Sequence, residues 1–192
     1  MPEPSSEGPV AYQGMPGAFS EEAARQLCGS TVWLRPCRTL DDVVRALTQG
    51  EAVSAVIPVE NSIAGEVPRS RSLVAQHHLE RRKTLALPVI HALIAAAEVR
   101  LDDVQEVRSH PMALAQCTRF LGSHPHMRAV SAFDTAGAVA DLMRTPRPGV
   151  AAIASRRAAE CWGAVVLADA IQDDRDNFTE FWLVTPTPLT RM

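Results

Sequence analysis

Segments typical of β-strands alternate with segments typical of helices along this chain, and this order limits the fold more than any other feature. Apolar runs at 10–13, 31–34 and 52–58 are separated by stretches with helical spacing at 19–27 and 40–48. In the 40–48 stretch, apolar residues recur at intervals of three and four, as they do on one face of a helix. Strands and helices that alternate in this way predict an α/β fold with a parallel sheet.

The second half of the chain repeats the alternation. A long extended segment is expected at 84–95, and Asp134 is the expected N-cap of a helix, as Ser20 is in the first half. Further strands are expected at 104–109, 127–132, 150–154, 165–168 and 180–184, and further helices at 111–121, 134–144 and 156–162. Because no segment rich in Pro, Gly or Ser separates the halves, we expect two interleaved lobes rather than two independent domains.

The expected boundaries follow from this pattern. A disordered tail is expected at 1–9, followed by one folded region at 10–188. Within that region we place the first lobe at about 10–85 plus 168–188, and the second at about 86–167.

Composition excludes several classes of protein. Of the 192 residues, 46% are hydrophobic and 21% are charged, which is close to the average of a soluble globular chain. A formal net charge of −3 offers no basic surplus for nucleic-acid binding. The N-terminus lacks the pattern of a signal peptide, and the longest apolar stretch, 85–97, is too short to cross a bilayer. We therefore expect a cytoplasmic protein with neither nucleic acid nor membrane as a partner.

The cysteines and histidines do not have the spacing of metal ligands. The four cysteines form no C-x-x-C pair, and two of them, Cys117 and Cys161, lie in apolar helical patterns where a thiol packs as a small hydrophobe. The histidine pairs at 77–78 and 124/126 lie in polar loops. We expect no metal site.

Two motifs in the first half follow predicted strands, where ligands bind in open α/β sheets. The segment QGMPGAFS, which contains Gly17, Ala18, Phe19 and Ser20, is a glycine-bearing turn before a helix. Backbone N–H groups there suit a carboxylate or phosphate, but the same pattern also fits a tight turn that needs positive φ. The second segment, PVENS, presents three polar side chains after a buried strand, and these either bind a ligand or complete a loop: Glu60, Asn61 and Ser62.

Two further motifs lie in the second half. Ser109 and His110 precede Pro111 and Met112 at a strand end, and a histidine there is either a hydrogen-bonded structural residue or a catalyst. The segment NFTEF, with Thr179, Glu180 and Phe181, leads into the last strand. The residues alone indicate a small anionic ligand and do not define a reaction.

These four motifs, in this order, resemble the catalytic domain of the prephenate dehydratases and of the plant arogenate dehydratases over about residues 10–185. The matching segments are AYQGMPGAFSEEAA, VIPVENSIAGEV, VRSHPMALAQC, DTAGAVADL, AAIASRRAAE and LADAIQDD followed by N-x-T-x-F. The resemblance implies two α/β lobes like those of type II periplasmic binding proteins, with prephenate in the cleft between them. Members of the family usually carry a C-terminal ACT domain that binds phenylalanine, and since this chain ends at Met192 we expect none here.

The resemblance also implies roles for the motif residues. It makes Asn61, Ser62 and Phe181 substrate-binding, and Thr179 matches the threonine that helps the ring hydroxyl to leave. The remaining positions expected to bind substrate are Gly17, Ala18, Phe19, Ser20, Glu60, Ser109 and Met112. No cofactor is implied, because the unsaturated ring itself accepts the electrons released by loss of CO₂.

Three positions depart from the family pattern. Met112 stands where the family has glutamine, Glu180 where it has arginine, and Ser72 where it usually has aspartate. Hydroxide is a poor leaving group, and a positioned general acid contributes about 10²–10⁴-fold to such a step. The changes at Met112 and Glu180 are expected to weaken that assistance.

We therefore expect a prephenate decarboxylase that protonates the ring on carbon, keeps the hydroxyl and gives dihydro-4-hydroxyphenylpyruvate. Such enzymes resemble dehydratases without an ACT domain and belong to specialised pathways, such as antibiotic biosynthesis, that branch from shikimate and aromatic amino acid metabolism. Glu180, if an apolar site keeps its carboxyl protonated, and His110 are the candidate proton donors. The alternatives are a prephenate or arogenate dehydratase and an inactive small-anion binder. The expected partner is the small-molecule substrate, and the candidate assembly is a homodimer.

Overall fold

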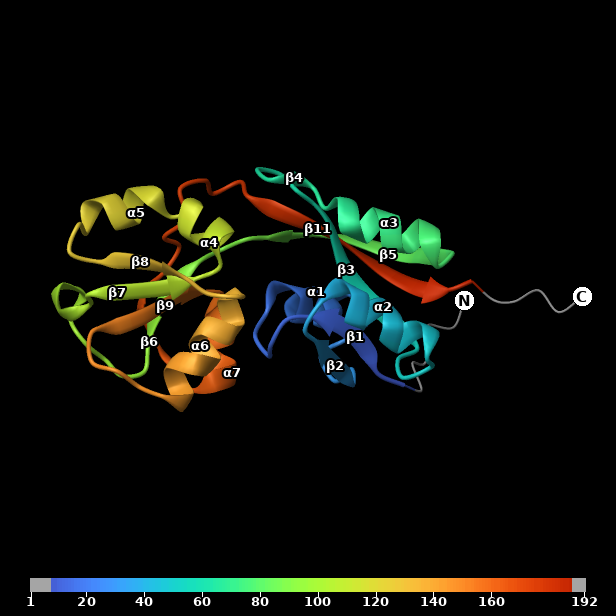
Figure 1. The fold of residues 1–192 in the computed structure, drawn as a ribbon, viewed down its shortest axis with the longest axis horizontal. Helices are drawn as coiled ribbons and strands as arrows, with labels where there is room; N and C mark the ends of the chain where they lie inside the picture. The colour runs from blue at the N-terminus through green and yellow to red at the C-terminus, as the bar shows by residue number, and fades with distance from the viewer. Residues whose placement is uncertain (1–7, 188–192) are drawn as a thin grey trace, which may run out of the picture. The chain divides into compact units, whose positions relative to one another are not determined.

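The computed structural model describes residues 8–187 and divides them into two compact units (Figure 1). The described part of the first unit comprises 8–14, 19–87 and 178–187, and the second comprises 15–18 and 88–177. The stretch 168–177, which we expected in the first lobe, is therefore grouped with the second unit.

The expected tail at 1–9 lies mostly outside the described residues, since these begin at residue 8. The two described residues of that stretch, Gly8 and Pro9, are part of the first unit rather than of a tail. Gly8 is buried, and the carbonyl of Pro9 accepts a hydrogen bond from the N–H of Val53 at 3.0 Å.

The first unit is built on a six-stranded sheet. Five strands form its main path in the order β2-β1-β3-β11-β5: β1 (Val10–Gln13), β2 (Leu34–Cys37), β3 (Ser54–Asn61), β5 (Leu79–Pro88) and β11 (Phe178–Pro186). The short strand β4 (Gly65–Glu66) pairs with β3. Strands β1, β2 and β3 are parallel, whereas β11 runs antiparallel to β3. The helices are α1 (Phe19–Cys28), α2 (Leu40–Thr48) and α3 (Pro68–Gln76).

Helices cover both faces of this sheet because alternate strand residues point to opposite sides. On β3, Ala55, Ile57 and Val59 pack with α2 and α3, whereas Val56 packs with α1. The apolar face of α2 predicted from its spacing is buried in the first of these clusters. A capping box starts α2: Thr39 accepts from the N–H of Asp42, whose carboxylate accepts from the N–H of Thr39.

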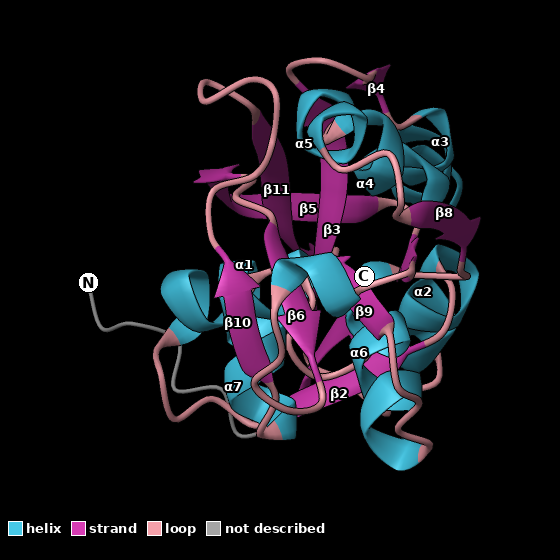
Figure 2. Ribbon diagram, turned by 90° about the vertical axis from the view of Figure 1, so that its left-hand side faces the viewer, coloured by secondary structure: helices cyan, strands magenta, loops and turns pink. Residues whose placement is uncertain are grey.

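The second unit contains a five-stranded sheet in the order β10-β6-β9-β7-β8. Its strands are β6 (Ala92–Ala95), β7 (Glu106–Ser109), β8 (Arg128–Ser131), β9 (Val150–Ala154) and β10 (Val165–Ala168). Its helices are the 3₁₀ turn η1 (Leu101–Asp103), α4 (Pro111–Ala115), α5 (Thr118–Ser123), α6 (Thr135–Arg144) and α7 (Arg156–Trp162). Figure 2 shows α6 beside β9 and α7 beside β10.

Both sheets have the same internal plan. Three parallel strands, β2-β1-β3 or β8-β7-β9, are followed by one antiparallel strand, β11 or β6. In the first unit the antiparallel strand, β11, follows the three parallel strands after the whole of the second unit. In the second unit the antiparallel strand, β6, precedes the three parallel strands in the sequence. Two such sheets, each packed with helices, confirm the expected α/β fold class.

Several expected elements have the expected bounds, among them β1, α2, β9, α7 and β10. Asp134 caps α6, as expected, by accepting a hydrogen bond from the N–H of Gly137. Ser20 was wrong as a cap, because α1 already begins at Phe19. The strand expected at 31–34 lies instead at Leu34–Cys37, where it pairs in register with β1.

Longer predicted segments are interrupted in the structure. The extended segment expected at 84–95 is two strands, β5 and β6, separated by residues 89–91, and the helix expected at 111–121 is the pair α4 and α5. Helix α3 was not predicted, since only two of its residues, Ser70 and Leu73, are buried. No helix within residues 8–187 combines the length and hydropathy needed to cross a membrane.

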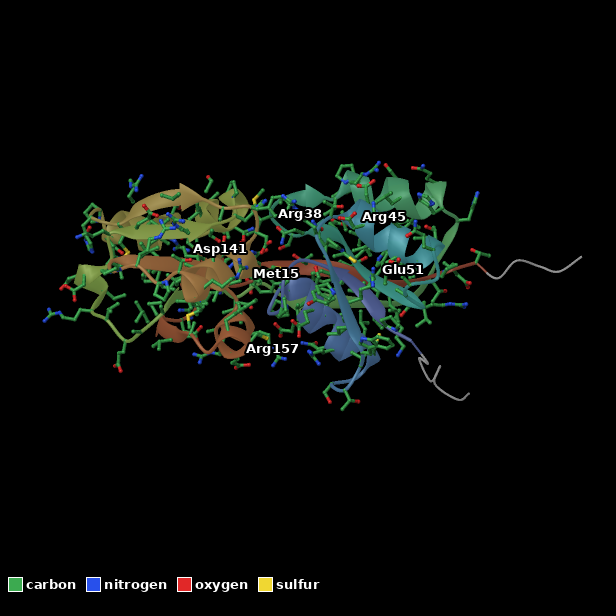
Figure 3. The ribbon with its side chains drawn as sticks, turned by 60° about the horizontal axis from the view of Figure 1, so that its bottom comes forward. Met15, Arg38, Arg45, Glu51, Asp141 and Arg157 are labelled. Atoms are coloured by element: carbon green, nitrogen blue, oxygen red, sulfur yellow. The ribbon has the colours of Figure 1, made fainter. Side chains whose placement is uncertain are left out.

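Charged side chains on the outer faces of the helices pair with each other; Figure 3 labels one member of two such pairs, Arg45 and Asp141. Arg45 of α2 bonds to Asp42 one turn earlier, and Asp141 of α6 pairs with Arg144 at 3.2 Å. Such exposed pairs contribute little to stability, about 0–1 kcal/mol each. The stability of each unit therefore depends on its apolar core more than on these ion pairs.

Candidate functional site

Asn61 and Thr179 form the centre of a polar cluster in the first unit. They are register partners at the end of β3 and the start of β11. The Asn61 amide Nδ2 donates to Thr179 Oγ1 at 3.0 Å and to the carbonyl of Phe178 at 2.9 Å. The Asn61 Oδ1 accepts from the N–H groups of Ile63 at 3.1 Å and Ala64 at 2.9 Å. One side chain thus joins the turn after β3 to the start of β11.

Ser62 adds a second connection between these two segments. Its backbone N–H donates to the carbonyl of Phe178, and its hydroxyl oxygen accepts from the N–H of Phe178, both at 3.0 Å. The candidate residues Asn61, Ser62 and Thr179 are therefore brought together, although about 117 positions separate them in the sequence.

Thr179 and Phe181 lie on the α1 face of the sheet. Phe181 is buried in the cluster formed with Ala23 and Leu27 of α1, against which Phe19 also packs. Thr179 is two residues earlier on the same strand, so the alternation of β11 directs it to the same side. Three of the expected substrate-binding or catalytic residues, Phe19, Thr179 and Phe181, thus share one face of the first unit.

Glu180 occupies the opposite face, with Trp182. Its Oε1 accepts a hydrogen bond from Trp182 Nε1 at 2.6 Å, and the guanidinium groups of Arg71 and Arg81 lie 5.3 and 5.0 Å from the centroid of the Trp182 ring. Arg71 also pairs with Glu60, with 3.8 Å between Nη2 and Oε2. The two expected acidic site residues, Glu60 and Glu180, therefore lie in a charged cluster around Arg71 and Trp182.

A register shift explains why Glu60 faces this cluster. Glu180 pairs with Glu60, but the next residue, Phe181, pairs with Pro58, so β3 has one extra residue at this point. A β-bulge of this kind redirects the side chains beyond it. It turns Glu60 toward Arg71 of α3 and leaves Asn61 opposite Thr179.

In the second unit, Ser109, His110 and Met112 follow the end of β7. The Ser109 hydroxyl is buried and donates to the carbonyl of Ile153 at 2.6 Å. The His110 ring caps α4, with Nδ1 accepting from the N–H of Met112 at 3.2 Å. Met112 is 45% exposed. Ser109 thus joins β7 to β9, His110 starts a helix, and the thioether of Met112 reaches the surface of the unit.

The glycine turn of residues 15–18 packs on α7 within the second unit. The carbonyl of Gly17 accepts from the Ser155 hydroxyl at 2.7 Å, and the carbonyl of Pro16 accepts from Trp162 Nε1 at 2.9 Å. Gly17 has a φ of +92°, and a Cβ there would collide with the backbone of Ala158. These contacts fit the tight-turn interpretation of the motif. The N–H of Ala18 donates to the carbonyl of Met15 at 3.0 Å.

Buried ionisable groups in the second unit have altered pKa values. His91 is 2% exposed, and its Nε2 lies 3.0 Å from Gln116 Oε1; burial lowers the pKa of His91, although the contact with Gln116 opposes this. Burial raises the pKa of the Cys117 thiol to about 12. Burial also opposes ionisation of Asp173, but hydrogen bonds from the Thr118 hydroxyl and the N–H groups of Thr118 and Arg119 outweigh it and hold its pKa below the usual value.

The sequence interpretation missed Trp182, Arg71 and Ser155 as neighbours of site residues. The position of Trp182 two residues after Glu180 was the available signal, because such residues share a strand face. Ser155 follows a buried strand and precedes a helical pattern, which is typical of an N-cap. Across residues 8–187, no group of three or more His, Cys, Asp or Glu residues could hold a metal ion.

Comparison with known proteins adds the family context. The sequence model of the family described as prephenate dehydratase matches residues 10–188. Arogenate dehydratase 5 of Arabidopsis thaliana is 40% identical over 181 residues, and arogenate dehydratase/prephenate dehydratase 6 of the same plant is 40% identical over 183. Both alignments cover 94% of this chain but only 42% and 44% of those proteins, so this chain spans less than half of their length.

Two solved structures are closely similar. The prephenate dehydratase of Arthrobacter aurescens in complex with L-Phe superposes with a TM-score of 0.86 and 29% identity, covering 96% of this chain and 61% of that one. A structure described as GqqA, a novel type of quorum quenching acylase, superposes with a TM-score of 0.85 and 32% identity, covering 96% of this chain and 66% of that one.

Proposed function

Because this chain belongs to the prephenate dehydratase family, we propose that it is a lyase acting on prephenate or arogenate, and that it removes both CO₂ and the ring hydroxyl. The bond from the ring to its carboxylate breaks, and its electron pair moves through the diene. The bond from the ring to the hydroxyl then breaks, and the oxygen leaves as water after taking up a proton. Prephenate gives phenylpyruvate in this way, and arogenate gives phenylalanine.

The observation that carries this proposal is the contact between Asn61 and Thr179. It fixes a hydroxyl on the α1 face of the first unit, two residues before the buried Phe181 on the same strand. A positioned hydroxyl can donate a hydrogen bond to the departing oxygen and stabilise the charge that develops there. The ring of Phe181, buried against α1, anchors the strand that carries this hydroxyl.

The test is product analysis with purified protein. We expect prephenate or arogenate to be consumed and the aromatic acid to be identified by mass spectrometry. Thr179→Val, which replaces the hydroxyl by a methyl group, is expected to lower kcat about 10²-fold or more. The matched control is Thr48→Val, because Thr48 lies at the exposed end of α2 and is expected to leave kcat unchanged. Ligand binding without any turnover would favour the inactive small-anion binder instead.

The second candidate function is the non-aromatising decarboxylase of specialised metabolism. It is favoured by the acidic side chain of Glu180 directly after Thr179, where the family motif has arginine, and by Met112 in place of the family glutamine. In this reaction CO₂ leaves, a ring carbon takes a proton and the hydroxyl stays. His110 is the proposed proton donor, because the carboxylate of Glu180, the other expected donor, faces Trp182 on the side of the sheet opposite Thr179 rather than an apolar site. The product would be heavier than phenylpyruvate by one water, so the same assay separates the two reactions.

A further inference from the structure

The hydrogen-bonding capacity of the Asn61 side chain is fully used inside the protein. An asparagine amide offers two N–H donors and an oxygen with two acceptor positions. The donors bond to Phe178 and Thr179, and the oxygen accepts from Ile63 and Ala64. The reverse orientation of the amide would set its N–H groups against the N–H groups of Ile63 and Ala64. The network therefore fixes which end of the amide faces Thr179.

We infer that Asn61 is a positioning residue that makes Thr179 a hydrogen-bond donor, rather than a residue that binds substrate. The amide nitrogen of Asn61 has no acceptor capacity, so Thr179 Oγ1 accepts in the 3.0 Å contact and its own hydrogen is directed elsewhere. A hydroxyl that accepts one hydrogen bond is polarised and donates the next one more strongly. Thr179 is thereby prepared to give a hydrogen bond to an oxygen of the ligand.

The surrounding backbone makes this arrangement rigid. Asn61 and Thr179 are register partners on adjacent strands. Two hydrogen bonds of 3.0 Å join Ser62 to Phe178, one between backbone groups and one from the Phe178 N–H to the Ser62 hydroxyl. Groups held on strands by several hydrogen bonds keep their orientation better than groups on unsupported loops. The direction of the Thr179 hydroxyl is therefore set before any ligand arrives.

The kinetic consequence rests on the proposed function and is tested with Asn61→Asp. The aspartate can still accept from Ile63 and Ala64, but it has no N–H to donate to Thr179 and instead attracts the threonine hydrogen. We expect kcat to fall about 10²-fold with KM changed by less than about 3-fold, because the Thr179 hydroxyl then donates to residue 61 instead of to the leaving oxygen. The hydrogen bond to the carbonyl of Phe178 is also lost, which thermal unfolding detects as a loss of stability. In the Thr179→Val background the same change is expected to have no further effect on kcat.

A direct substrate contact predicts a different result. It would raise KM in Asn61→Asp, and the losses from the two substitutions would add; either finding overturns the inference. If Asn61→Asp does not fold, Asn61→Ser replaces it in the cycle, since a serine hydroxyl supports the same kind of turn without reaching Thr179. Thermal unfolding of each variant establishes that it is folded before its rates are compared.

A measurement without substrate separates this inference from the proposed function. In ¹⁵N-labelled protein, the side-chain NH₂ group of Asn61 is expected to exchange slowly with solvent, and Thr179→Val is expected to shift the resonance of one of its two hydrogens. A fast-exchanging NH₂ group that does not respond to Thr179→Val would overturn the inference even in an active enzyme. Failure of the wild type to turn over prephenate or arogenate, with the NH₂ result as expected, would overturn only the proposed function.

Discussion

Trp182 donates its indole N–H to the carboxylate of Glu180, two residues earlier on the same face of β11, at 2.6 Å. The guanidinium groups of Arg71 and Arg81 lie over the indole ring. An acidic residue at position 180 therefore complements two positive charges, and the carboxylate is held away from the strand face that carries Thr179.

The first prediction concerns the product of the reaction. Replacing Met112 by Gln and Glu180 by Arg together is expected to raise the fraction of aromatic product, because the double variant restores the residue types of the family motif at both positions. Mass spectrometry of the two keto acids measures this fraction. Glu98→Arg is the matched control, since it makes the same charge change at an exposed site in the second unit. An unchanged product ratio in the double variant would show that positions 112 and 180 do not determine which product forms.

A check on folding belongs to this experiment. Glu180→Arg brings a third positive charge to the cluster of Arg71 and Arg81, whereas Glu180→Gln keeps an oxygen acceptor for Trp182. We expect the arginine variant to unfold at a lower temperature than the glutamine variant. Product ratios are therefore compared at a temperature where every variant is folded.

The second prediction concerns the turn on α7. Gly17→Ala is expected to lower the free energy of unfolding by about 3 kcal/mol or more, because it adds left-handed backbone strain to a collision with Ala158. Gly163→Ala is the matched control, with a φ of +66° but open space around its Cβ, and should cost only about 1–2 kcal/mol. Chemical denaturation measures both. Equal losses of unfolding free energy in the two variants would mean that the collision with Ala158 does not destabilise Gly17→Ala.

The third prediction is a pH dependence of stability caused by His91. Its folded-state pKa lies below the ordinary value of 6.5, so the unfolded chain takes up the proton first as the pH falls. The contribution of His91 is therefore fully present above about pH 6.5 and is lost progressively as the pH falls through its lower folded-state pKa. Denaturation curves across this range should show the loss, and His91→Gln should flatten it. The same slope in the variant would assign the pH dependence to other groups.

The fourth prediction concerns cysteine reactivity. The thiolate is the reactive form, and burial raises the pKa of Cys117 to about 12, so this thiol should resist alkylation in the native protein. Cys161 is exposed and should react under the same conditions. Peptide mapping after iodoacetamide treatment, with and without denaturant, distinguishes the two. Rapid native labelling of Cys117 would mean that the second unit opens locally.

Elements with a strong local signal were predicted well from the sequence. The apolar spacing of α2 gave its correct bounds, and the strand and helix expected at 150–154 and 156–162 also have the bounds observed for β9 and α7. Helix α3 gave no such signal, because its segment is rich in Arg and Ser and buries only Ser70 and Leu73. The interruption between β5 and β6 was also missed, since residues 84–95 are continuously apolar enough to be interpreted as one extended segment.

The candidate site depended on information that no local pattern contains. Asn61 and Thr179 lie 118 positions apart, so spacing alone could not pair them, and the family resemblance was needed to name both. The resemblance still could not place Glu180, because the partner that determines its direction, Trp182, is not part of the motif that was compared. Nor could it show that Asn61 has all its hydrogen bonds satisfied, since that depends on the backbone of Ile63 and Ala64.

The position of β11 between β3 and β5 has a consequence for how the protein is made. During translation, β1, β2 and β3 leave the ribosome before any strand of the second unit, but β11, the strand that joins β3 to β5, follows the whole of the second unit in the sequence. Until then the growing chain carries an open β3 edge of the kind that invites aggregation. The first unit is thus begun before the second unit and completed after it, and its open β3 edge is the surface that a chaperone of nascent chains would shield.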